Sequence, residues 1–148
     1  MRTIKFRVFD KQYKKMLGVE TLYINEEMFK PIDGNEYNVW CYDTEYCSEL
    51  MQYTGLKDKN GKNIYEGDIV SFDPSVPPLG VMPQEDEVGI IKYILNSFLV
   101  VTKNNVNYDI DELGDWVVIG NIHENPGLLD ATAKKRQSSL HRRDKRAN

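Results

Sequence analysis

Residues 49–72 read ELMQYTGLKDKNGKNIYEGDIVSF, which is two stretches rich in strand-forming residues on either side of a turn. The turn is centred on Asn60-Gly61, a dipeptide that accepts positive φ angles cheaply and therefore joins antiparallel strands. Gly67 then permits a tight corner, after which Ile69 and Val70 begin another pleated strand. This stretch predicts a sheet of short strands, as found in small barrels.

Period-two alternation continues the pattern on both sides of this stretch. Near the N-terminus, Ile4, Phe6 and Val8 alternate with Lys5 and Arg7, as in a strand with one face on the core and one in water. Further strands are predicted at residues 13–17, 21–24, 37–42, 88–95, 98–103 and 116–120. A two-residue turn at Asn96-Ser97 is predicted to join two of them.

The absence of long helical periodicity sets the fold class. No segment of about 12 residues shows sustained apolar spacing of i, i+3, i+4 and i+7, so no crossover helix can support a parallel sheet. We therefore expect a mainly β, small barrel-like antiparallel domain, SH3-like or a sandwich, over residues 1–130. Short helical turns are expected at residues 108–115 and 125–129.

The formal charge of −4 conceals two parts of opposite sign. Residues 131–148 hold seven Lys and Arg against Asp144, which gives about +6 for this tail and about −10 for the rest. Few large apolar side chains occur in the tail, so a disordered basic extension is predicted. Such a tail either folds back on the acidic body or attracts nucleic acid. The candidate nucleic-acid contacts are Lys134, Lys135, Arg136, Arg142 and Arg143.

Three blocks of sequence carry a family resemblance: IKFRVFDK at 4–11 followed by Lys15-Met16, LMQYTGLKDKNGKNIYEGDIV at 50–70, and VIGNIHENP at 118–126. Together they resemble the YopX-like proteins of bacteriophages and prophages of Gram-positive bacteria. The resemblance covers residues 1 to about 129 and implies a small, mostly β, phage-encoded accessory protein. It brings no catalytic residues, and family members generally end near the third block, so the basic tail departs from the pattern.

Two acidic segments were natural candidates for a metal site. With Gly61 at position 6 of a calcium-binding EF-hand loop, Leu56 falls at position 1 and Gly67 at position 12, where carboxylates are needed. A hairpin turn is therefore the better interpretation of that segment. The second cluster could in principle hold Mg²⁺ for metal-dependent hydrolysis, but a solvated acidic turn is the better interpretation. Its members are Asp109, Asp111, Glu112 and Asp115.

Covalent chemistry finds little support in the sequence. Cys41 lies in an apolar run and is expected in the core, while His123 suits a surface hydrogen bond beside Glu124. Two cysteines and two histidines cannot build a convincing zinc site, and no nucleophile elbow or phosphate-binding loop is present. We expect no catalytic residue, metal or cofactor. Without a signal-peptide or membrane-spanning stretch, a place in the bacterial cytoplasm is expected.

Aromatic residues suggest a contact surface for another protein. A cluster of four lies beside Asp43 and Glu45, whereas aromatic sites that stack nucleic-acid bases are lined with Lys and Arg. The acidic surroundings favour a protein interface, or simply the core and rim of a barrel. The cluster is Tyr37, Trp40, Tyr42 and Tyr46. The proline-rich loop at 73–87 is a second candidate contact.

The function expected from the sequence is a non-enzymatic protein-interaction module that binds a host or phage protein. Attachment to nucleic acid through the basic tail is the alternative, and hydrolysis at residues 109–115 is a third interpretation. Unpaired sheet edges would also permit self-association by strand pairing.

Overall fold

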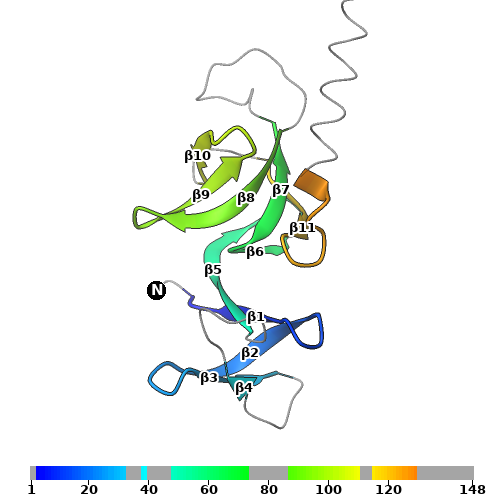
Figure 1. The fold of residues 1–148 in the computed structure, drawn as a ribbon. Coiled ribbons are helices and arrows are strands. Elements are labelled where there is room, and N and C mark those ends of the chain that lie inside the picture. Colours follow the sequence, from blue (N-terminus) through cyan, green and yellow to red (C-terminus); the bar gives the residue numbers. More distant parts are fainter. Residues whose placement is uncertain (1–2, 33–37, 40–47, 74–86, 111–114, 130–148) are drawn as a thin grey trace, which may run out of the picture. The chain divides into compact units, whose positions relative to one another are not determined.

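The computed structural model describes residues 3–32, 38–39, 48–73, 87–110 and 115–129, and the regular secondary structure in these ranges is almost entirely β (Figure 1). Within them, the strands form two antiparallel sheets, one of six strands and one of five. The chain divides into two compact units. The first unit comprises residues up to Lys57 together with Asn63–Glu66, and the second comprises Asp58–Lys62 together with the chain from Gly67 onward.

The first unit contains the six-stranded sheet, in the order β4-β3-β2-β1-β5-β6. Its strands are β1 (Phe6–Asp10), β2 (Lys15–Tyr23), β3 (Met28–Pro31), β4 (Asn38–Val39), β5 (Glu49–Lys57) and β6 (Asn63–Tyr65). One face of the sheet carries a core cluster in which Val8 and Phe29 are fully buried, and Phe9 and Met51 are buried on the opposite face. Partly buried Leu17, Val19, Leu22 and Leu50 pack against Val8 and Phe29.

The second unit contains the five-stranded sheet, in the order β10-β9-β8-β7-β11. Its strands are β7 (Asp68–Phe72), β8 (Glu87–Ile94), β9 (Ser97–Thr102), β10 (Asn107–Asp109) and β11 (Val117–Asn121). Every second residue of β9 is buried, as the pleat requires when one face meets the core. In that core the Phe72 ring lies 5.1 Å from the Tyr108 ring and 5.2 Å from the Trp116 ring, measured between centroids.

The turn chemistry of the central stretch is confirmed. Gly61 has a φ of 81° and Gly67 a φ of 74°, a region that favours glycine because it has no Cβ. The turn between β8 and β9 is one residue earlier than predicted, at Leu95 and Asn96 rather than at Asn96-Ser97. Both residues have positive φ, 51° and 66°, which is the geometry of a two-residue type I′ turn.

The mainly β antiparallel class is confirmed, while the barrel description fits only loosely, because in neither sheet do the first and last strands pair. The helical turn predicted at 108–115 is wrong at Tyr108 and Asp109, which lie in β10. The predicted strands at 13–17 and 21–24 are one strand, β2, with a bulge between Val19 and Thr21. Leu128 and Leu129, the last two described residues, are helical.

Gly18 lies inside β2, between the two strands predicted at 13–17 and 21–24. A Cβ at this position would lie 2.7 Å from Cδ1 of Ile32, so glycine serves here to admit a neighbouring side chain. The Ile32 N–H also donates to the Gly18 carbonyl at 3.0 Å. In the part of the chain that the structure describes, no helix has the length and apolar character to cross a bilayer.

Candidate interaction surfaces

The contact residues predicted from the sequence fall outside the described residues. This holds for the aromatic cluster Tyr37, Trp40, Tyr42 and Tyr46, for residues 74–86 of the loop predicted at 73–87, and for the tail contacts Lys134, Lys135, Arg136, Arg142 and Arg143. The last residue of that loop, Glu87, lies in β8. The assignment of the predicted contacts to partner or nucleic-acid binding stays a prediction.

The acidic segment at 109–115 is described only at its ends. Asp109 is half-buried in β10 and Asp115 is exposed, whereas Asp111 and Glu112 lie outside the described residues. Among the described residues, no group of three or more His, Cys, Asp and Glu is placed to hold a metal ion.

Asp58 organises the central turn through its carboxylate. Its Oδ1 accepts hydrogen bonds from the N–H groups of Asn60 at 2.9 Å and Lys62 at 2.8 Å, and its Oδ2 accepts one from Val118 at 3.1 Å. The Lys59 N–H donates to the Trp116 carbonyl at 3.0 Å, so the turn covers the outer edge of β11. The hairpin interpretation of this segment is confirmed, with the carboxylate binding backbone N–H groups.

The same contacts set the ionisation of Asp58. Burial of the carboxyl raises its pKa, whereas hydrogen bonds from the N–H groups of Lys62, Val118 and Asn60, and the Lys62 charge, lower it. The lowering outweighs the raising, so the pKa lies below its ordinary value. Asp58 is therefore a charged structural anchor rather than a proton-transfer group.

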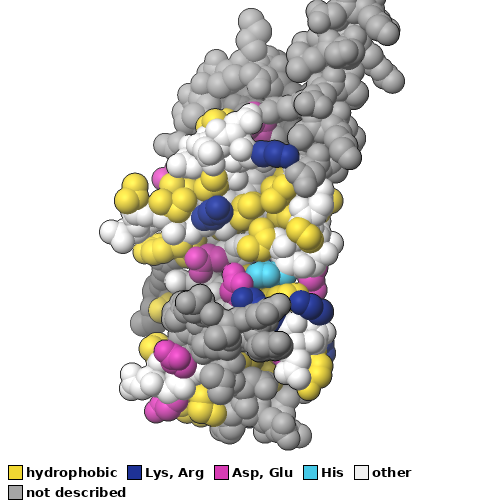
Figure 2. All heavy atoms as spheres, in the orientation of Figure 1, with side chains coloured by type: hydrophobic (Ala, Val, Ile, Leu, Met, Phe, Trp, Pro, Cys, Tyr) yellow, Lys and Arg dark blue, Asp and Glu magenta, His cyan; other side chains and the backbone are white. Residues whose placement is uncertain are grey.

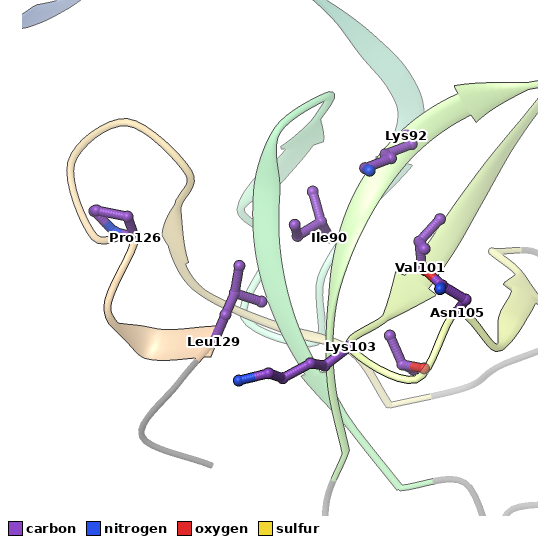
Figure 3. A pocket seen from close by; sticks show the side chains of 8 residues that line it. Ile90, Lys92, Val101, Lys103, Asn105, Pro126 and Leu129 are labelled. Carbon is purple, nitrogen blue, oxygen red and sulfur yellow. The ribbon is translucent and has the colours of Figure 1, made fainter. Parts of the chain in front are cut away.

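A groove of about 300 Å³ lies on the second unit (Figure 3). Its lining comes from β8, β9, the turn after β9 and the segment after β11, and consists of Ile90, Lys92, Val101, Thr102, Lys103, Asn105, Pro126 and Leu129. Figure 3 shows Pro126 and Leu129 on one side and Lys92, Val101 and Asn105 on the other. The groove therefore combines an apolar surface with two lysines.

The strand register explains the apolar floor of the groove. Ile90 and Val101 are directly opposite each other in the β8–β9 ladder, so their side chains point to the same face of the sheet. The buried core residues Ile91 and Val100 are the next opposed pair and point to the other face. The groove thus lies on the sheet face opposite Ile91 and Val100.

Hydrogen bonds within a tight turn hold Lys103 and Asn105 in place. Oγ1 of the buried Thr102 accepts from the Val106 N–H at 3.2 Å, and the Thr102 N–H donates to the Val106 carbonyl at 3.0 Å. The Asn105 N–H donates to the Thr102 carbonyl at 2.9 Å, and Asn105 has a φ of 58°. One side of the groove is therefore a well-defined loop, which limits the entropy lost on binding.

The opposite side of the groove is fixed by a close approach at Gly120. A Cβ there would lie 2.7 Å from both Oδ1 of Asn125 and Cδ1 of Leu128, so glycine lets this segment pack against β11. Oδ1 of Asn121 accepts hydrogen bonds from the N–H groups of His123 at 3.1 Å and Glu124 at 2.9 Å. These contacts position Pro126 and Leu129, which follow immediately.

The β8–β9 hairpin presents a second surface at its tip. Leu95 is 92% exposed and Tyr93 is 53% exposed, and the Tyr93 ring lies 5.0 Å from the Phe98 ring. A leucine with positive φ is unusual, because its Cβ crowds the following carbonyl oxygen. An exposed apolar side chain is therefore held at this tip in a strained backbone conformation.

Comparison with known proteins identifies the family. The sequence model of the YopX protein family matches residues 5–130. The chain belongs to the YopX family. Protein EF1440 from Enterococcus faecalis, known from a crystal structure, is 33% identical, with a TM-score of 0.58 and an alignment that covers 87% of this chain and 99% of that one. YopX from Bacillus subtilis, also a crystal structure, has the same fold at 21% identity and a TM-score of 0.53, over 87% and 97% of the two chains.

Membership of the YopX family accounts for the fold but assigns no site, and no curated protein matches the chain. Sequence reasoning identified neither the groove nor the hairpin tip. No short sequence motif marks the groove, because the residues that line it are spread between Ile90 and Leu129. The hairpin tip did carry a local signal in the sequence. Its two turn residues are Leu95 and Asn96, whereas such turns usually contain Asn-Gly.

Proposed function

We propose that this YopX-family chain is a phage- or prophage-encoded, non-enzymatic module that binds a protein of the host or the phage in the bacterial cytoplasm. The family resemblance supports the phage origin. The observation that carries the interaction role is the tip of the β8–β9 hairpin, where Leu95 is 92% exposed at a φ of 51°.

The backbone strain and the solvent exposure of Leu95 both support a role for this residue in binding a partner protein. Leucine in the left-handed region costs roughly 1–2 kcal/mol, and an exposed leucine recovers none of that by burial within its own chain. Asparagine or glycine would form the same turn with less strain. A pocket in the partner that buries Leu95 would explain why a leucine occupies this turn, since buried apolar anchors contribute much of the binding energy of many interfaces. On the face drawn in Figure 2, hydrophobic side chains also lie at the surface among Lys and Arg.

The test compares stability and partner capture in the same variants. The tagged full chain is produced in a bacterial host, treated with DNase and RNase, crosslinked and purified. Leu95→Asn relieves the strain, so it should raise stability by about 1 kcal/mol while reducing capture of the wild-type partner roughly tenfold. Tyr13→Asn, which removes a side chain that is 74% exposed in a turn of the first unit, is the matched control and should leave capture unchanged.

Equal capture by Leu95→Asn and wild type would contradict the proposal. Capture that disappears on nuclease treatment would contradict it as well and would indicate nucleic acid bound through the basic tail.

A further inference from the structure

We infer that the groove on the second unit binds a short peptide segment that carries a carboxylate beside an apolar side chain. This inference rests on the proposed function and names the chemistry of the partner. The groove of about 300 Å³ is at the lower end of the volumes of ligand pockets, which suits a few side chains rather than a large cofactor.

The charged residues that line the groove predict that its ligand is negatively charged. Lys92 comes from β8 and Lys103 follows β9, and the described residues that line the groove include no Asp or Glu. The ammonium group of Lys92 at this concave surface attracts an anion and disfavours a cation. Asn105, at the same rim, carries an amide that can both donate to and accept from a peptide backbone.

The apolar residues that line the groove favour a peptide over an oligonucleotide as the ligand. Ile90, Val101, Pro126 and Leu129 supply aliphatic surface, and the described lining contains no aromatic ring on which a base could stack. Sites for single-stranded nucleic acid combine basic residues with such rings. An acidic and apolar peptide therefore fits this lining better than an oligonucleotide does.

The groove and the hairpin tip belong to the same pair of strands. Lys92 and Leu95 are three residues apart along β8 and its turn, a separation of roughly 10 Å in extended chain. One partner segment can therefore place a carboxylate at the groove while a pocket of the same partner receives Leu95. This continuity unites the two surfaces in one binding site.

The test is an NMR titration of the isotopically labelled full chain with the peptide acetyl-Glu-Leu-Glu-Leu-amide. The backbone amides of Lys92, Lys103 and Asn105 should shift, and binding should weaken steeply as salt is raised. Replacing the peptide's Glu by Gln, or its Leu by Ser, should weaken binding on the order of tenfold. The double variant K92E/K103E should do the same.

The matched control is K14E/K57E, which changes the net charge equally at two exposed lysines of the first unit. It should bind the peptide as the wild type does. Equal binding by K92E/K103E, absence of shifts at the groove, or a single-stranded oligonucleotide that shifts these amides when the peptide does not would overturn the inference. If the peptide fails while Leu95→Asn still reduces capture, the groove assignment falls and the proposed function stands.

Discussion

Replacing Asp58 by Asn should cost about 3 kcal/mol of unfolding free energy, because the carboxylate uses both of its oxygens. Asparagine keeps Oδ1 for the N–H groups of Asn60 and Lys62, but as a neutral acceptor, which forfeits about 1 kcal/mol. Its Nδ2 then faces the Val118 N–H, so a buried donor loses its acceptor, at a further cost of about 1–3 kcal/mol.

Asp10 provides a matched control for this change. It is also buried, but a single oxygen, Oδ1, accepts both of its turn hydrogen bonds, from the N–H groups of Gln12 and Tyr13 at 2.9 Å. Asparagine preserves that geometry, so Asp10→Asn should cost only about 1 kcal/mol. Urea denaturation near neutral pH measures both costs, and hydrogen exchange at the Val118 amide should report lost protection in Asp58→Asn alone.

The pH dependence gives a second check on Asp58. Because the folded-state pKa is lowered from 3.8, the charged carboxylate contributes stability that is complete above that value and is lost as the pH falls through the folded pKa. The gap between wild type and Asp58→Asn should therefore be constant near neutrality and shrink below pH 3.8. Equal costs for the two Asp→Asn variants, or a gap insensitive to acid, would refute this reasoning.

Three further predictions concern the backbone and the groove. Gly89→Ala should destabilise the second unit by about 1–3 kcal/mol in urea denaturation, because the added Cβ would clash with Cγ1 of Val100. An unchanged midpoint would contradict this prediction. Gly61→Ala should lose about 1 kcal/mol on account of its φ of 81°, whereas Gly127→Ala, also in open space, should not. Thr102→Val should weaken peptide binding at the groove, measured by titration, because it removes the Oγ1 acceptor that holds the turn; unaltered affinity would argue against that role.

Much of the fold was predictable because its signals are local. The Asn60-Gly61 turn depends on neighbouring residues only, and this expectation matches the structure. The strand predicted near the N-terminus is present as β1, but its expected alternation is not, because Ile4 is 67% exposed and precedes the strand, and Phe9 is buried beside Val8. The break predicted between the strands at 13–17 and 21–24 is wrong because Gly18 leaves room for the side chain of Ile32, fourteen residues away. The β8–β9 turn was misplaced because Leu95 adopts a conformation that its residue type disfavours. The groove escaped prediction because three separate segments build it, and only the tertiary fold brings them together.

The chain crosses between its two units three times, since Asp58–Lys62 interrupts the first unit and belongs to the second. The turn that joins β5 to β6 therefore belongs to a different unit from the two strands that it connects. No single cut in the gene separates the two units. A fragment that starts at Gly67 would lack Asp58, whose carboxylate accepts a hydrogen bond from Val118 in the edge strand β11. Any division of the chain into two parts should therefore leave the segment from Glu49 to Phe72 intact.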